Sequence, residues 1–141
     1  MRIACTILLT TLLVSCGRSD PGAAELEKKF EQQLSGATLT GQFTSNGKIG
    51  GEDKYTISKV SKVTGETWLF QVRLQYGTHD VTVPIPLTVK WAGDTPMVTL
   101  TDLSIPGLGT YTARVLFYKD GYAGTWSGKN HGGALFGKIV K

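Results

Sequence analysis

The sequence has few residues that could bind a metal or provide a reactive thiol. Among 141 residues, two are cysteine and two are histidine. Neither His79 nor His131 stands at a spacing that would form a closed ligand set with another histidine or a carboxylate. A Gly-x-Ser-x-Gly nucleophile elbow is also missing, so the His79-Asp80 dipeptide has no evident serine partner for hydrolase chemistry. The sequence therefore predicts no metal site, no cofactor, no catalytic residues and no enzymatic activity.

The sequence also has no large excess of positive or negative charge. The 15 lysine and arginine residues exceed the 11 aspartate and glutamate residues only slightly, and they are scattered along the chain. No basic cluster of the kind that marks a nucleic-acid or polyanion site is present, so we expect no nucleic-acid partner. Internal repeats and low-complexity tracts are absent, and the length suits a single domain.

The N-terminus has the pattern of a secretory signal. Met1 and Arg2 are followed by the apolar run 3–14, which contains nothing more polar than threonine and cysteine. As a helix this run would span about 18 Å, well short of the roughly 30 Å hydrocarbon core of a bilayer. We therefore expect residues 1–15 to be a cleaved signal peptide and not a transmembrane anchor.

The end of this signal, Leu13-Val14-Ser15-Cys16, resembles the lipobox of bacterial lipoproteins. The resemblance implies that Cys16 is the lipid attachment site, carries acyl chains such as palmitate, and becomes the first residue of the mature protein. Cys5 would leave with the signal, so the mature chain would have no free thiol and no disulfide. We therefore expect a lipid-anchored protein of the cell envelope. Because Gly17 stands where an aspartate would suggest inner-membrane retention, we expect the outer membrane in preference to the inner membrane.

A short amphipathic helix is predicted within residues 16–36, after the lipidated N-terminus and a linker. Asp20 can cap a helix that begins with Pro21, and Gly36 can end it. The apolar residues between them recur at steps of three and four: Ala23, Leu26, Phe30 and Leu34. This narrow apolar stripe suits a helix that covers one end or face of another element.

Residues 37–141 are predicted to form one all-β domain, because the apolar period changes to two and β-branched and aromatic residues become frequent. The clearest alternation, Trp68 to Tyr76, predicts that Trp68 and Phe70 face the core and that Gln71 faces solvent. Turn residues separate eight expected strands: 38–44, 54–63, 67–76, 81–91, 97–105, 110–119, 122–127 and 134–140.

Short connections between successive strands favour an antiparallel meander, either as an up-and-down barrel or as a two-layer sandwich. Pro84 and Pro86 lie two residues apart, so their missing N–H groups face the same side of one strand. We expect that unpaired side to face the preceding strand and to leave a seam. A partly open, lipocalin-like barrel of about eight strands fits this expectation best.

Three glycines within the predicted strands, and two acidic residues between strands, have structural interpretations. Gly41, Gly124 and Gly137 interrupt strands, which is typical of barrel corners, although they could instead leave interior volume for a ligand beside Trp126. Glu52-Asp53 stands in a glycine-rich segment and is interpreted as a solvated turn whose carboxylates project in different directions.

Three segments, 89–96, 105–114 and 122–137, resemble a family of uncharacterised small exported bacterial proteins, chiefly planctomycete. The resemblance covers most of 39–139 and implies no assigned activity.

The densest group of unusual residues lies on the connection 127–133, which has glycines at both ends. Its tip Lys129-Asn130-His131, together with Trp126, is the candidate contact site for a ligand or partner. The alternative is a turn in which His131 is merely exposed.

Two functions remain open. The first is a structural or interaction module of the envelope, held at the membrane by its lipid and meeting another envelope protein. The second is a lipocalin-like carrier of a small apolar ligand. An interior filled to ordinary packing density favours the first, whereas a cavity of roughly 300 Å³ or more, lined by aromatic residues, favours the second.

Overall fold

The computed structural model describes residues 21–141. The predicted signal peptide, the lipobox with Cys16, Cys5 and the predicted helix cap at Asp20 lie outside the described residues. Among the residues that are described, no helix combines the length and the apolar character needed to cross a bilayer.

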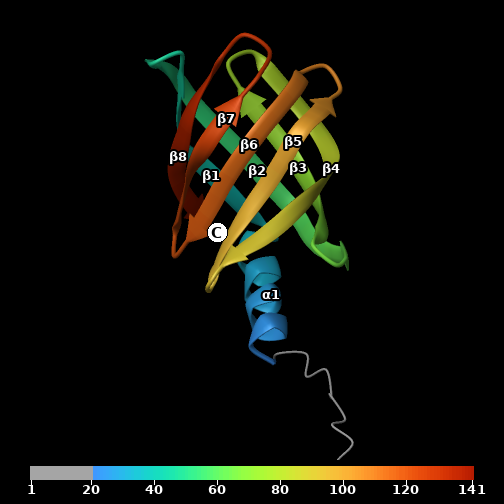
Figure 1. The fold of residues 1–141 in the computed structure, drawn as a ribbon. Coiled ribbons are helices and arrows are strands. Elements are labelled where there is room, and N and C mark those ends of the chain that lie inside the picture. Colours follow the sequence, from blue (N-terminus) through green and yellow to red (C-terminus); the bar gives the residue numbers. More distant parts are fainter. Residues whose placement is uncertain (1–20) are drawn as a thin grey trace, which may run out of the picture.

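One helix precedes eight antiparallel strands that close into a barrel in sequence order (Figure 1). The predicted helix and the eight-stranded meander are both confirmed. The largest difference from the predicted bounds is the second strand, which begins at Lys48 instead of residue 54. The elements are α1 (Pro21–Leu34), β1 (Ala37–Ser45), β2 (Lys48–Thr64), β3 (Thr67–Tyr76), β4 (His79–Ala92), β5 (Thr95–Ile105), β6 (Gly109–Tyr118), β7 (Gly121–Ser127) and β8 (Gly132–Val140).

Helix α1 lies at one end of the barrel, and its C-terminal half, with Phe30 and Leu34, closes that end (Figure 1). The chain leaves the helix at Gly36, whose positive φ of 75° suits glycine and whose amide donates to the Ile57 carbonyl oxygen at 2.8 Å. Phe30 and Leu34, on the predicted apolar stripe, are buried. The Phe30 ring packs edge-on against Trp68, with ring centroids 5.2 Å apart, and lies close to three further aromatic rings: Phe70, Trp91 and Phe117.

Alternation along the strands separates the core from the solvent face as predicted. Trp68, Phe70 and Val72 of β3 are buried, whereas Gln71, which lies between Phe70 and Val72, is exposed. The end of the barrel next to α1 is therefore packed with large side chains, and the contribution of the helix is to complete that packing.

The prediction that Pro84 and Pro86 leave their strand unpaired on the side of the preceding strand, β3, is wrong. All of β3 pairs with β4, with Leu69 opposite Pro86 and Gln71 opposite Pro84. The β4–β5 ladder, by contrast, ends at the pair Thr88 and Thr99. The two prolines therefore lie beyond the end of that ladder, and their missing N–H groups face β5, where they cost no ladder hydrogen bond. The barrel is nevertheless closed.

The strand glycines serve close approach between backbones and side chains. Gly41 of β1 is paired with Gly137 of β8. A Cβ atom on Gly41 would lie 2.1 Å from the Phe136 carbonyl oxygen and 2.5 Å from the Tyr122 hydroxyl oxygen. The space left by these two glycines is thus occupied by the Tyr122 side chain. A Cβ atom on Gly124 would lie 2.0 Å from the Arg114 carbonyl oxygen, which again indicates close strand approach.

Gly41→Ala should therefore lower the free energy of unfolding by about 1–3 kcal/mol or more, because added atoms in a packed interior force backbone and side chains apart. Gly121→Ala is the matched control, since a Cβ atom there would meet its nearest neighbours at ordinary distances of 3.6 and 3.7 Å. Urea unfolding of both variants measures the difference. Equal midpoints would contradict this explanation of Gly41.

Candidate ligand-binding site

The barrel contains an interior cavity of about 330 Å³, and all eight strands contribute to its wall. Most of the lining is aliphatic or aromatic, for example Leu39, Val72, Ile85, Leu100 and Leu135. The volume equals that of roughly ten liquid water molecules at about 30 Å³ each, and it lies within the range of small-molecule sites in proteins. The large side chains of the barrel therefore do not fill its interior.

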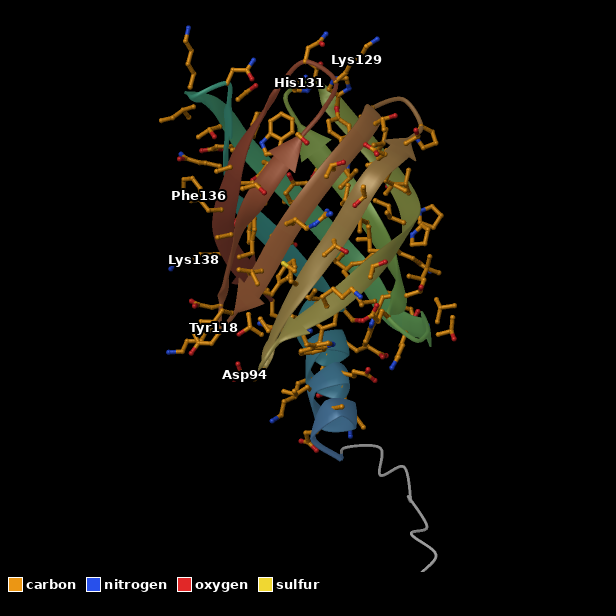
Figure 2. The ribbon with its side chains drawn as sticks, viewed as in Figure 1. Asp94, Tyr118, Lys129, His131, Phe136 and Lys138 are labelled. Atoms are coloured by element: carbon orange, nitrogen blue, oxygen red, sulfur yellow. The ribbon has the colours of Figure 1, made fainter. Side chains whose placement is uncertain are left out.

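Four rings lie together at one end of the cavity: Phe43, Tyr111, Trp126 and His131, here called the aromatic mouth. Figure 2 shows His131 at the end of the barrel opposite α1. The Trp126 and His131 ring centroids are 5.1 Å apart, and those of Phe43 and Trp126 are 5.9 Å apart. Tyr111 completes the group, with its ring centroid 6.2 Å from that of Trp126. The edge-on contacts of Trp126 with His131 and Phe43 are favourable for aromatic rings and give the mouth a defined shape.

Hydrogen bonds fix the aromatic mouth to the neighbouring β1–β2 hairpin. The Trp126 indole Nε1–H donates to the Thr44 carbonyl oxygen at 3.0 Å. The Asn46 backbone N–H donates to the Gly132 carbonyl oxygen at 2.8 Å. Within the β7–β8 connection, the Gly128 backbone N–H donates to the His131 carbonyl oxygen at 2.7 Å. The position of the mouth is thus set by backbone structure on both sides.

The structure brings together two of the four predicted contact residues. Trp126 and His131 both line the cavity and touch edge to face. Lys129 and Asn130 are exposed at the tip of the connection and do not line the cavity, and Figure 2 shows Lys129 directed away from the barrel. The glycine at position 128 has a role here, because a Cβ atom there would lie 2.9 Å from His131 Cε1.

The interpretation of Glu52-Asp53 as a solvated turn is wrong. Both residues lie in β2, where Glu52 is exposed and Asp53 is 3% exposed. The Tyr55 hydroxyl donates to Asp53 Oδ2 at 2.7 Å, and the Tyr122 hydroxyl donates to Asp53 Oδ1 at 3.1 Å. These three residues are called the carboxylate cluster. Two of them, Asp53 and Tyr55, belong to the inward-facing alternation of β2 that also includes Ile57. That period of two was the available signal, and the flanking glycines obscured it.

Burial dominates the electrostatics of the carboxylate cluster. It raises the pKa of Asp53 above its usual range, and the hydrogen bonds from Tyr55 and Tyr122 offset part of this effect. Burial, with the nearby Asp53 carboxylate, also raises the pKa of Tyr122 above its usual range. The Tyr122 hydroxyl therefore stays protonated and remains a donor to Asp53.

The raised pKa of Asp53 predicts how stability changes with pH. The folded protein binds this proton more tightly than the unfolded chain, whose aspartates titrate near pH 4. The stabilising contribution is complete below about pH 4 and is lost as the pH rises through the higher folded-state pKa. Asp53→Asn should therefore gain stability relative to the native protein over that range, by about 1.4 kcal/mol per unit of pKa difference.

Urea unfolding of both proteins at a series of pH values measures this gain. If the native protein instead became more stable relative to Asp53→Asn as the pH rose, the tyrosine hydrogen bonds would outweigh the cost of burial. The pKa of Asp53 would then be lowered and not raised.

A second hollow, of about 680 Å³, lies on the outer surface beside β1, β2 and the β3–β4 turn. Its lining is mostly polar and exposed, and includes Glu52, Lys54 and His79. Asp80 at its edge accepts two hydrogen bonds from the Arg73 guanidinium, at 2.8 and 2.7 Å, which lower the pKa of that carboxyl. Within residues 21–141 no group of three or more histidine, cysteine or acidic side chains could hold a metal ion.

The fold and the cavity define a closed eight-stranded meander barrel with a hollow apolar interior. Comparisons with family models, with curated proteins and with solved structures find no match to this chain. The resemblance to small exported bacterial proteins therefore stays a prediction.

Proposed function

We propose that this protein binds a small apolar molecule inside its barrel, with the aromatic mouth as the way in. The observation that carries this proposal is the cavity of about 330 Å³ with its predominantly apolar lining. Helix α1 and the aromatic side chains around Phe30 fill the opposite end, so a ligand would enter past Trp126 and His131.

Packing energetics support a binding role for the cavity. Protein interiors are normally close-packed, and an unfilled apolar volume lowers stability in proportion to its size. An apolar ligand would recover that loss, because each square ångström of apolar surface removed from water is worth about 25 cal/mol. A cavity of this kind is therefore expected to have measurable affinity for molecules of matching size.

The test is fluorescence titration with N-phenyl-1-naphthylamine, which is neutral and brightens in apolar surroundings. Ala113 is buried and lines the cavity, whereas Ala123 is exposed on the outer face of β7. Ala113→Leu should weaken binding by about tenfold or more, because the added side-chain atoms occupy part of the cavity that the ligand would fill. Ala123→Leu makes the same chemical change outside and should leave binding unchanged. A native protein that leaves the probe dim would contradict the proposal.

We also propose that the protein is exported and held at the outer membrane by lipid on Cys16, which would place the barrel close to a source of apolar molecules. This part of the proposal is supported by the apolar run 3–14 and the lipobox pattern that ends at Cys16.

Cys16→Ser should abolish lipidation and release the protein from the membrane fraction, because two or more acyl chains are needed for stable anchoring and none would remain. Metabolic labelling with a radioactive fatty acid, followed by fractionation, measures both effects. The barrel should remain folded, as judged by an unchanged urea midpoint. Undiminished labelling of the variant would mean that Cys16 is not the attachment site.

A second candidate function is an interaction module, and one surface feature favours it. Leu116 of β6 and Phe136 of β8 are 41% and 48% exposed, and both are paired with Ala123 of β7, so they form an apolar row across the outside of three strands. Figure 2 shows Phe136 on the outer side of the barrel, above Lys138. If this row is an interface between two copies, sedimentation velocity should detect a dimer that Phe136→Ser disrupts. A native protein that stays monomeric at all concentrations would exclude that assembly.

A further inference from the structure

Asp53 has no basic partner in the described part of the chain. The ion pairs found within residues 21–141 involve other carboxylates, those of Glu25, Glu27, Glu66 and Asp80. Asp53 instead accepts hydrogen bonds from two neutral hydroxyl groups. A buried carboxylate without a cation nearby is energetically costly, and a positively charged group that approached it would reduce that cost.

The carboxylate cluster offers hydrogen-bond acceptors and negative charge. The Tyr122 hydroxyl donates its proton to Asp53, so its oxygen can serve a ligand only as an acceptor. Each carboxylate oxygen can accept more than one hydrogen bond and accepts one from a tyrosine. The chemical group that matches this cluster is a donor, and a cationic donor matches it best.

The cluster lies at the boundary between the apolar cavity and the polar outer surface. Tyr55 and Tyr122 line the cavity, while Asp53 borders the polar hollow on the outside. On β1, Gly41 is paired with Asp53, and the next inward residue toward the mouth is Phe43. Tyr122 packs against Phe117, with ring centroids 6.3 Å apart, and Phe117 in turn lies against Phe30 of α1. A molecule whose polar end reached the cluster would therefore place its remaining length among the apolar side chains that line the cavity.

We propose, building on the proposed binding function, that the ligand is a small amphiphilic amine whose ammonium group is held at Asp53 and Tyr122. The ammonium donates a hydrogen bond to the Tyr122 hydroxyl oxygen and lies within about 6 Å of the Asp53 carboxylate, a range in which opposite charges stabilise each other. Its apolar tail occupies the cavity of about 330 Å³.

Ligands with other polar ends fit less well. A fatty acid would bring a second negative charge beside Asp53, which is unfavourable for both groups. An alcohol of the same length would donate a neutral hydrogen bond, which is roughly half as strong as a charge-assisted one. The order of affinity expected for one chain length is amine, then alcohol, then carboxylate.

The experiment measures displacement of N-phenyl-1-naphthylamine by octylamine, octanol and octanoate at one neutral pH. In the native protein octylamine should bind at least about tenfold more tightly than octanol, because a hydrogen bond with one charged partner is worth more than about 1.4 kcal/mol and the Asp53 carboxylate attracts the ammonium in addition. Asp53→Asn should remove this preference and keep octanol binding. Glu52→Gln is the matched control, since it removes the neighbouring carboxylate on the exposed face and should keep the preference.

Two results would overturn the amine assignment while leaving the cavity function intact. One is equal affinity of octylamine and octanol for the native protein, and the other is an amine preference that survives in Asp53→Asn. Should that variant fail to fold, Tyr122→Phe serves instead, and an undiminished amine preference in it has the same meaning. Failure of N-phenyl-1-naphthylamine itself to bind the native protein is a different outcome, which would contradict the proposed function.

Discussion

Replacing Phe30 with alanine should lower the free energy of unfolding by about 3–5 kcal/mol, the usual cost of truncating a buried aromatic side chain. Phe30 is 2% exposed and its ring lies against Trp68, Phe70, Trp91 and Phe117. The loss would combine the transfer energy of the ring with a void at the end of the barrel that α1 fills. Urea unfolding followed by tryptophan fluorescence measures the change.

The control for this prediction is Lys28→Ala, on the exposed face of the same helix. Exposed substitutions usually change stability by no more than about 0.5 kcal/mol. If both variants unfolded at the same urea concentration, α1 would not be part of the folded core, and the closed end of the barrel would have to be reconsidered.

Trp68→Ala should have an effect of similar size, about 3–5 kcal/mol, for the same physical reason. Trp68 is 1% exposed on β3 and packs against Phe30. Gln71→Ala, on the opposite face of the same strand, should be nearly neutral because that side chain is exposed. Equal urea midpoints for the two variants would mean that the core face of β3 is assigned incorrectly.

Because Phe30 and Trp68 touch, their effects should not add in the double variant. The fall in stability expected for Phe30→Ala with Trp68→Ala is smaller than the sum of the two single falls. Strict additivity would show that helix and barrel are stabilised independently.

Local pattern predicted most of this fold because each strand carries its own signal. The alternation around Trp68 and the turn glycines between strands are properties of adjacent residues, and they located the helix and all eight strands. The start of β2 was missed because Gly50 and Gly51 weaken the strand signal there. Gly51 is nevertheless paired with Phe43 of β1, and Gly50 is the extra residue of β2 where the register shifts after Phe43.

Features that depend on contacts between distant strands could not be predicted from one sequence. Whether the backbone nitrogens of Pro84 and Pro86 face β3 or β5 depends on how these two strands pair with β4, and only the three-dimensional structure shows this pairing. Likewise Tyr122 lies 69 residues from Asp53 in sequence, so no local pattern could join them.

The candidate site was predicted in part for the same reason. Trp126, near the end of β7, and His131, in the connection that follows, lie close together in sequence, and the structure places both at the cavity. Their neighbours Lys129 and Asn130 share the connection but lie at its exposed tip. Whether large side chains fill a barrel or leave a cavity depends on how they pack, which residue counts alone do not determine.

Native mass spectrometry of the protein from its own cells tests the central claim most directly. The Cys16→Ser form, which needs no detergent once it is released from the membrane, should be purified gently and sprayed alongside its Ala113→Leu variant. Binding in the cavity predicts a discrete additional mass on the first protein, lost on denaturation and greatly reduced in the variant. If the protein carries the mass of its polypeptide alone, under conditions in which added N-phenyl-1-naphthylamine stays bound, it does not hold a ligand in its own cells, and that result would contradict the proposed carrier function.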